Sequence, residues 1–448
     1  MIFDIEADGL LDDVTKIHCL VIKHLEGGKI ERFNNQTNNP FRSVTEGLLR
    51  LEQAAAEGKK LIAHNGINYD IQVIRKLYPS ISIPNASIVD TLVLSRLICP
   101  DLKDTDSKLL AAGKLPGDCY RSHSLKAWGY RLGNPKAEYS GGWEAWSTEM
   151  EDYCVQDVET LASLYQYLTS TPYSPISVQL EHAVAHIIGR QQRYGFLFDM
   201  PKATALYASL CQRRAELEEE LTSVFTPRLL RSGEPLVPKV NNKSRGYTEG
   251  AAVQKLVVTS FNPGSRDHIY HWLHWMFGWV PTEFTDEGKP KVDETILESL
   301  DKYPEARLLI EYLTVSKRIG QLSEGKQAWF THVKADGRIH GLVLTNGAVT
   351  GRMTHASPNM AQVPASYSPY GHDCRELFTV PFGKSLVGAD ASALELRCLA
   401  GYMAKYDEGA YIRTVTEGRK EDGTEIHTVN RKALEIDSRD DAKTWFLN

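Results

Sequence analysis

The sequence predicts a multidomain protein of mixed α/β and α+β class, and three observations predict it. The chain has 448 residues, which is more than one hydrophobic core usually supports, so about three domains are expected. Short strand-like runs alternate with helical patterns over residues 1–170. Long helical patterns follow, until a second strand-to-helix pattern appears near residue 384.

The composition is that of a soluble globular protein, with 42% hydrophobic and 24% charged residues. No window reaches about 18 uninterrupted apolar residues, and no basic stretch with an apolar run begins the chain, so neither a membrane span nor a secretory signal is expected. The seven cysteines are scattered and never form C-x-x-C, which favours reduced thiols in a cytosol over disulfides or a zinc site. Because the net charge is −6, any nucleic-acid contact must use a local patch.

The first ten residues, MIFDIEADGL, predict a strand with two acidic side chains on one face. Side chains alternate along a strand, so Asp4 and Glu6 point one way while Phe3 and Ile5 point to the core. Two neighbouring carboxylates repel each other unless a cation lies between them, and oxygen ligands suit Mg²⁺ or Mn²⁺. The alternative is an edge strand with a solvated acidic face.

Two further acidic positions follow in order along the chain. The run KKLIAHN predicts a short strand that leads to Asp70 in the first turn of a helix, where the helix dipole favours a carboxylate. The segment 147–168 predicts an amphipathic helix on which Tyr153 and Asp157 share a face. Each has an ordinary alternative, a helix-capping aspartate and a solvated helix face respectively.

The second half offers weaker signals. Residues 171–178 predict a linker, and residues 227–247 predict a basic loop that either is plain surface or follows phosphates. Arg352 follows Thr350 and Gly351 in a strand–turn context, and Asn359 and Gln362 come shortly after it. Side chains of these types can contact the minor-groove acceptors that all base pairs share.

A strand-to-helix pattern at 384–404 places Asp390 at the end of a strand, where an α/β arrangement carries its ligand-binding residues. Glu395 lies one helical turn further on. In the last segment, Arg439 and Lys443 are four residues apart, so they share a helix face and could clamp phosphates.

Taken together, the N-terminal motifs resemble the proofreading 3′→5′ exonucleases of the DEDD type, which have a ribonuclease-H-like fold. The resemblance implies that Asp4, Glu6, Asp70 and Asp157 hold two metal ions and that Tyr153 orients the attacking water. Two metal ions about 4 Å apart stabilise both the attacking and the leaving oxygen of a phosphodiester displacement.

The whole chain resembles the family A (polymerase I type) DNA polymerases, and within them the replicative polymerases of T-seven-like phages. The stretches that carry the resemblance are HNGINYD, DTLVLSRL, SHSLKAWGYRLG, FNPGSRDHI, NGAVTGRMTHASPNMAQVP, ADASALELRCLA and RDDAKTW. It implies a right-hand architecture in the cytoplasm of a bacterial host: exonuclease at 1–170, thumb at 171–335, first half of the palm at 336–400 and start of the fingers at 401–448.

The resemblance also implies roles at the polymerase site, with DNA, deoxynucleotides and Mg²⁺ as partners. Asp390 matches the first metal-binding carboxylate of the palm, and Glu395 matches the residue beneath the sugar of the incoming nucleotide. His427, Arg439 and Lys443 match residues near the triphosphate, and Arg352, Asn359 and Gln362 match primer–template contacts. Leu447 occupies a position that is usually Phe or Tyr, so slower incorporation and stronger discrimination against dideoxynucleotides are expected.

The family's second palm carboxylate is not found before Asn448, so we expect a complete exonuclease and an incomplete polymerase site. A split gene with a separately encoded C-terminal half, an intein or intron, and a truncated sequence are the open explanations. The rival interpretations are a non-catalytic DNA-binding subunit of a split polymerase and a stand-alone exonuclease. The short segment at 227–247 replaces a longer thioredoxin-binding insertion of the phage enzyme, so binding of a thioredoxin-type processivity factor is not expected.

Overall fold

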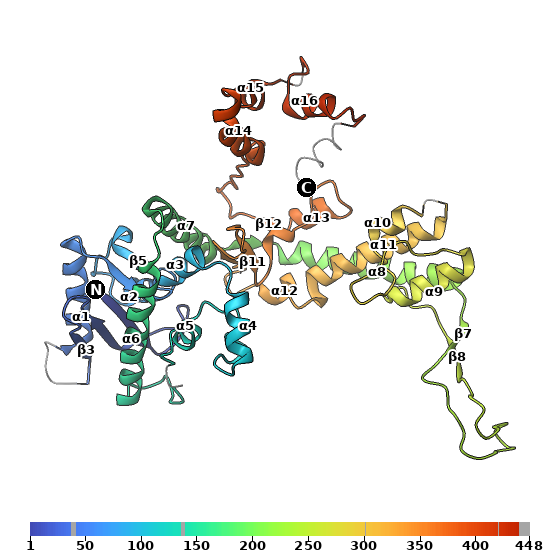
Figure 1. The fold of residues 1–448 in the computed structure, drawn as a ribbon, viewed down its shortest axis with the longest axis horizontal. Coiled ribbons are helices and arrows are strands. Elements are labelled where there is room, and N and C mark those ends of the chain that lie inside the picture. Colours follow the sequence, from blue (N-terminus) through green and yellow to red (C-terminus); the bar gives the residue numbers. More distant parts are fainter. Residues whose placement is uncertain (37–41, 136–138, 301, 420, 439–448) are drawn as a thin grey trace. The chain divides into compact units, whose positions relative to one another are not determined.

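The computed structural model of the chain describes residues 1–36, 42–135, 139–300, 302–419 and 421–438 (Figure 1). The chain divides into two compact units, Met1–Thr379 and Val380–Asn448. The first unit begins with an α/β domain and continues into a mostly helical region, and the second unit is helical in its described part.

A five-stranded sheet forms the centre of the N-terminal domain. Its order is β3-β2-β1-β4-β5, in which β1 pairs antiparallel with β2 and parallel with β4. The bounds of these strands are β1 Ile2–Ala7, β2 Ile17–Lys23, β3 Ile30–Asn34, β4 Leu61–Ala63 and β5 Ile88–Asp90. Strand β1 is therefore the middle strand of the sheet, and the interpretation of residues 1–10 as an edge strand with a solvated acidic face is wrong.

Helices cover both faces of this sheet, because its strands carry apolar side chains on both faces. Phe3 and Ile5 pack on one face against α1 (Val44–Ala56) and α2 (Asp70–Leu77). On the other face, Ile2 packs in the cluster that includes Cys154 and Val158 of α6 (Thr148–Ser170). Serine side chains cap the start of α1 and of α6: Ser43 accepts a hydrogen bond from the Glu46 amide, and Ser147 accepts one from the Met150 amide. The expected helix at 147–168 is confirmed.

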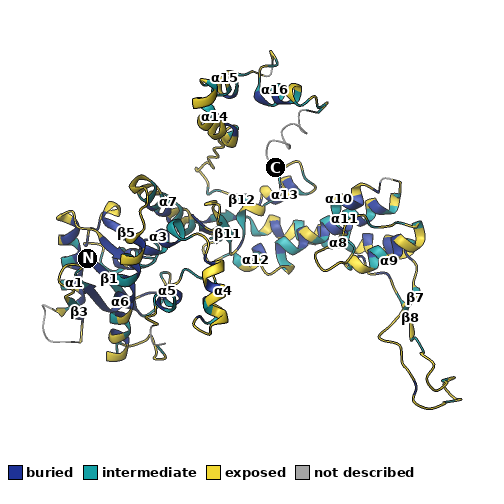
Figure 2. Ribbon diagram, in the orientation of Figure 1, coloured by how far each residue is buried: buried dark blue, intermediate teal, exposed yellow. Residues whose placement is uncertain are grey.

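Three shorter helices complete the domain. They are α3 (Thr91–Ile98), α4 (Lys103–Ala111) and α5 (Leu125–Arg131). Two of them, α3 and α5, pack against α6. Leu94 of α3, Leu125 and Trp128 of α5, and Leu161 of α6 share one core with the sheet. Figure 2 shows the dark, buried strands between more exposed helices.

The middle of the chain is dominated by two long helices. Helix α7 (Pro175–Tyr194) ends at Gly195, strand β6 (Phe196–Phe198) follows, and α8 (Met200–Val224) begins after the capping residue Asp199. Gly195 and β6 thus separate the two helices. The expected linker at 171–178 is shorter than predicted, because Ser174 caps α7 and Pro175 occupies its first turn, a position where proline costs no hydrogen bond.

Helix α8 packs against α11 (Pro304–Ile319) in a core that includes Leu210, Leu217, Leu309 and Val315. The other helices of this region are α9 (Arg266–Phe277), α10 (Glu294–Glu298), α12 (Trp329–His332) and α13 (Gly371–Arg375). Two small sheets, β12-β6-β9 and β10-β11, use β9 (Arg338–Ile339), β10 (Leu342–Leu344), β11 (Thr354–Ala356) and β12 (Phe378–Thr379).

Residues 227–247 differ from the expected loop, because they begin with a strand. Strand β7 (Arg228–Arg231) pairs antiparallel with β8 (Leu256–Thr259), so the basic segment is one arm of a longer hairpin (Figure 1). The partner strand lies beyond the prolines and glycines of the segment, which is why the local sequence did not predict the pairing.

The second unit contains α14 (Leu394–Asp407), α15 (Ala410–Glu417) and α16 (Ile426–Ala433), around a small core of Leu396, Ala400, Val415 and Ile426. The strand expected before α14 is wrong: residues 384–393 form neither strand nor helix. A strand needs a neighbour for its backbone hydrogen bonds, and the described part of this unit contains none.

No helix in the described part of the chain combines the length and the apolarity that crossing a bilayer requires.

Candidate functional site

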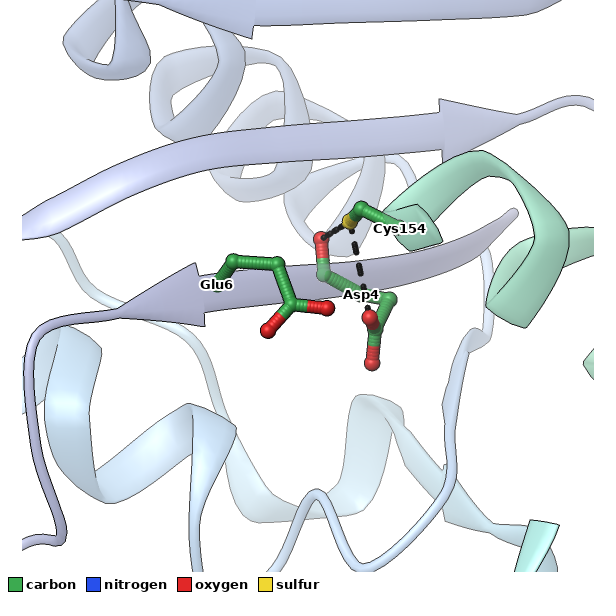
Figure 3. A group of neighbouring side chains, drawn as sticks. All are labelled: Asp4, Glu6 and Cys154. Atoms are coloured by element: carbon green, nitrogen blue, oxygen red, sulfur yellow. Dashed lines mark hydrogen bonds between the residues drawn. The ribbon is translucent and has the colours of Figure 1, made fainter. Parts of the chain in front are cut away.

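Asp4 and Glu6 lie on the face of β1 that is turned toward α6, as the alternation of the strand predicts (Figure 3). Ligand atoms of these two carboxylates and the sulfur of Cys154 all lie within 4.8 Å of one another. Glu6 is buried, at 8% exposure, whereas Asp4 is half-buried. Two carboxylates this close together, one of them buried, are stabilised by a compensating positive charge.

Cys154 lies next to the Asp4–Glu6 pair, on α6. Its thiol donates to Asp4 Oδ2 at 3.4 Å and also approaches the Asp4 carbonyl at 3.5 Å (Figure 3). Burial raises the pKa of the Cys154 thiol, and the neighbouring Cys19 and the charge of Asp4 raise it further. The thiol is therefore a neutral hydrogen-bond donor to Asp4.

Asp70 lies in the first turn of α2, as expected, but it does not cap that helix. The cap position is Tyr69, and Asp70 is buried with its Oδ1 lacking a hydrogen-bond partner. Burial raises the pKa of Asp70, and the negative charges of Asp90 and Asp157 add to the effect. An unpartnered buried carboxylate oxygen is costly, so the interpretation of Asp70 as a plain helix-capping residue is wrong.

Asp157 and Tyr153 lie one turn apart on α6. Asp157 is buried, at 7% exposure, and close enough to Asp70 for its charge to act there, so the alternative of a solvated helix face is wrong for this residue. The Tyr153 ring lies 5.7 Å from the ring of Tyr139, on the segment that leads into α6.

The pKa of Tyr69 indicates that several of these acidic groups lie near one another. Burial raises the pKa of Tyr69 to about 12, and the negative charges of Asp70, Glu6 and Asp4 contribute in that order. The structure thus brings β1 and the start of α2 to a single acidic site, and Asp157 joins it through Asp70.

Asp90 is a residue of this site region that the sequence analysis did not single out. Its buried carboxylate accepts the backbone amides of Asn65 at 2.9 Å, Ile67 at 3.0 Å and Leu92 at 2.9 Å. Asp90 therefore fastens the loop that leads to Asp70 while it caps α3. Its position directly after an apolar strand and before a helical run was the available signal.

The residues expected to contact primer and template lie after β10. Arg352 is exposed in the turn between β10 and β11, which agrees with the expected strand–turn context. The side chain of Asn359 caps a short 3₁₀ helix, Met360–Gln362, by accepting from the Ala361 amide at 3.0 Å, and Gln362 is exposed.

In the second unit, Asp390 is exposed in irregular backbone and not at a strand end, whereas Glu395 is exposed in the first turn of α14. His427 lies in the first turn of α16, with its Nε2 3.9 Å from Glu425 Oε1. Arg439, Lys443 and Leu447 lie outside the described residues.

The donor set of the first site fits hard divalent cations. Asp4, Glu6, Asp70 and Asp157 offer only carboxylate oxygens, which Mg²⁺ and Mn²⁺ prefer. The orphaned Oδ1 of Asp70 and the crowding of Asp4 and Glu6 are both relieved by a cation. Cys154 would be a softer metal ligand than a carboxylate, and its thiol donates its hydrogen bond to Asp4.

Comparison with known proteins relates this chain to polymerases. Residues 1–169 match the RNase_H superfamily, and residues 240–445 match DNA polymerase family A. The chain is 39% identical to the DNA-directed DNA polymerases of Enterobacteria phage T3 and of Escherichia phage T7, over 99% of this chain and 74% of each relative.

More distant relatives agree. The thermostable DNA polymerase I of Thermus filiformis is 27% identical over 56% of this chain and 33% of its own. The fold is similar to the POL domain of Pol1 from M. smegmatis, solved in complex with DNA primer-template and dNTP, with a TM-score of 0.65 at 16% identity, over 99% of this chain and 67% of that one. The ribonuclease-H-like fold and the polymerase resemblance expected from the motifs are confirmed, and the chain belongs to the family A DNA polymerases.

Proposed function

We propose that the N-terminal domain is a metal-dependent 3′→5′ exonuclease that removes nucleotides from single strands and frayed primers. The observation that carries the proposal is the close pair of carboxylates, Asp4 and Glu6, on β1. Two further features support it: Asp70 is buried with an unpartnered oxygen and within electrostatic reach of Asp157, and Tyr69 feels the charges of Asp70, Glu6 and Asp4. Because the set contains only acidic ligands and no groups that recognise a base, the reaction is independent of sequence.

In this proposal each residue has a distinct task. The four carboxylates would hold two Mg²⁺ ions, or Mn²⁺ in their place, and the bound ions would supply charge stabilisation for the phosphodiester displacement. Tyr153 donates or accepts a hydrogen bond to orient the attacking water without competing for metal. Cys154 holds one oxygen of Asp4 by its thiol hydrogen bond, and Asp90 holds the loop before Asp70.

For the polymerase reaction, the relatives support DNA and deoxynucleotides as substrates. We assign metal binding to Asp390, nucleotide contacts to Glu395, His427, Arg439, Lys443 and Leu447, and primer–template contacts to Arg352, Asn359 and Gln362. The division into exonuclease (1–170), thumb (171–335), palm (336–400) and fingers (401–448) belongs to the same proposal.

The test is a primer–template with a 5′ label on the primer, incubated with Mg²⁺ in the presence and absence of the four nucleotides. The parent should shorten the primer, EDTA should stop the reaction, and Asp4→Ala should abolish it while DNA affinity stays largely intact. Asp286→Ala, which removes an exposed carboxylate elsewhere in the first unit, is the matched control and should behave as the parent.

Two results would contradict the assignment. Unchanged shortening by Asp4→Ala would mean that the metal ligands are wrong. A parent that retains DNA but never shortens it would favour the non-catalytic DNA-binding interpretation.

A further inference from the structure

The exposed face of α7 near its C-terminal end carries positive charge without acidic partners (Figure 1). A cavity of about 580 Å³ lies on this face, lined by Ile187, Arg190, Gln191, Arg193 and Tyr194. Four of these five residues recur at intervals of three, one and three, so they share one face of the helix. No carboxylate lines the cavity, and neither arginine forms an ion pair with any residue that the structure describes.

A third arginine, from another helix, adds its charge to the same place. Arg75 in the last turn of α2 donates to the Ile83 carbonyl at 2.9 Å and to Asn85 Oδ1 at 2.7 Å, so uncharged groups hold its guanidinium. Burial lowers the pKa of Arg193, and the charges of Arg75 and then of Arg190 lower it further. The three guanidinium groups therefore repel one another.

Several arginines elsewhere in the same unit do have acidic partners. Arg213 bonds to Glu311 at 2.7 Å, and Arg214 bonds to Glu324 at 2.9 Å. The chain has a net charge of −6, so carboxylates are not scarce, and yet none offsets the cluster on α7 and α2 within the described residues. Because crowded and partly buried like charges cost free energy, an anion is the ligand that such a cluster favours.

Helix dipoles explain only part of this arrangement. Arg193 lies in the last turn of α7 and Arg75 in the last turn of α2, where the negative end of the dipole favours a cation. That effect acts on each helix separately and does not require the two helix ends to bring their cations together. It predicts a loss of stability when an arginine is removed, and no effect on the binding of a ligand.

The cluster lies beside the loop that leads to Asp70. A Cβ placed on Gly189 of α7 would be 2.5 Å from Asn68 Oδ1 and 3.1 Å from Arg193 Nη1, so these two side chains are neighbours. Asn68 precedes Asp70 by two residues. An anion bound at the cluster would therefore be near the candidate acidic site without occupying it.

We propose that Arg75, Arg190 and Arg193 form a site for the phosphates of a single-stranded nucleic acid, separate from the acidic site and independent of the sequence of the strand. Guanidinium groups offer paired N–H donors that fit phosphate oxygens. The repeating charge of a strand suits three cations spread over two helices. The choice of a nucleic acid over an acidic peptide rests on the proposed function, which already brings DNA to this domain.

The test measures how binding depends on salt, without turnover. The full 448-residue chain carrying Asp4→Ala is titrated, by fluorescence anisotropy, into a 5′-fluorescein-labelled oligothymidine twenty-mer at salt concentrations between about 50 and 200 mM. Each phosphate contact to a single strand contributes about 0.7 to the slope of log K against log salt concentration. Arg190→Gln/Arg193→Gln, added to Asp4→Ala, removes two cations, so we expect the slope to become shallower by about 1.4.

Two further double variants separate charge from folding. Arg190→Lys/Arg193→Lys keeps both charges and should keep the parental slope. Lys108→Gln/Lys114→Gln removes two exposed cations on and just after α4 and should also leave the slope unchanged. Melting temperatures of all variants should agree within a few degrees.

A parental slope in the Arg190→Gln/Arg193→Gln protein would overturn the proposal, and the helix dipoles would then account for the arginines. If that protein keeps the slope but loses binding of a labelled decaglutamate, the cluster takes an acidic peptide and the proposal is equally wrong. If the parent shortens DNA while the slope is unchanged in the variant, only this inference fails. If the slope changes as expected but the parent shows no nuclease activity, the proposed catalytic assignment fails and the phosphate site stands.

Discussion

Replacing Asp90 tests how the loop before Asp70 is held. In Asp90→Ala the carboxylate that accepts the amides of Asn65, Ile67 and Leu92 is lost. Asp90 is 1% exposed, so water replaces the lost acceptor poorly. Each orphaned buried amide costs about 1–3 kcal/mol, and the amide of Leu92, a half-buried residue, regains part of its loss from solvent. We therefore expect the free energy of unfolding to fall by about 3–5 kcal/mol.

The same change should displace Asp70, because Asp70 follows the fastened loop directly and begins α2. A catalytic group that moves by about 1 Å can lose roughly a hundredfold in rate. We expect the exonuclease kcat of Asp90→Ala to fall between about tenfold and a hundredfold, with KM changed much less. Asp90→Asn keeps one acceptor oxygen, so its kcat should lie between those of Asp90→Ala and the parent.

The assays are urea denaturation and single-strand exonuclease kinetics at a temperature at which each variant is folded. Asp101→Ala is the matched control, because Asp101 accepts one exposed amide, that of Lys103, and should cost at most about 1 kcal/mol without affecting kcat. An Asp90→Ala protein as stable as the parent would refute the hydrogen-bond argument. A destabilised protein with parental kcat would refute the positioning of Asp70.

Three other predictions concern stability. Asp106→Ala leaves Arg131 buried without its two-bond partner, at 2.8 Å for each bond, and should lower the unfolding free energy by about 3–5 kcal/mol in urea; a loss below about 1 kcal/mol would contradict this. Burial and then the charges of Arg96 and Arg131 lower the pKa of His123 from 6.5 to about 4. Between these two pH values only the unfolded state binds the proton, so the free energy of unfolding decreases as the pH is lowered from 6.5 to about 4. His123→Gln should remove about 1–2 kcal/mol of that pH dependence, allowing for partial exposure, and an unchanged slope would argue against it. Gly47→Ala places a Cβ 2.6 Å from Leu20 Cδ2 and 2.7 Å from a Phe33 ring carbon, so thermal unfolding should show a loss of about 1–3 kcal/mol, whereas an unchanged Tm would show that this core can adjust.

Local sequence predicted the elements that carry the acidic site. Alternation along residues 1–7 was sufficient to place Asp4 and Glu6 on one face, because the side-chain period of a strand is fixed by its backbone. The serine-capped helices and the break at Gly195 were equally predictable, since caps and glycines act within a few residues.

Non-local pairing was not predictable in the same way. The partner of β7 begins more than twenty residues later, and the apolar run before α14 has no partner strand among the described residues. The predicted loop therefore contains a strand, and the predicted strand is irregular backbone. Strand formation depends on a neighbour that supplies hydrogen bonds, and a local window contains no information about that neighbour.

The sequence by itself determined which residues carry acidic, aromatic and basic chemistry, and the order and spacing of its motifs indicated the family to which the chain belongs. Only the tertiary structure decided that β1 is the middle strand of its sheet, that Asp70 is buried with an unpartnered oxygen, that Cys154 donates to Asp4, and that Asp90 holds the loop before Asp70. The reason is physical: burial and electrostatic coupling arise between segments that lie far apart in the chain, and they exist only after those segments have packed together.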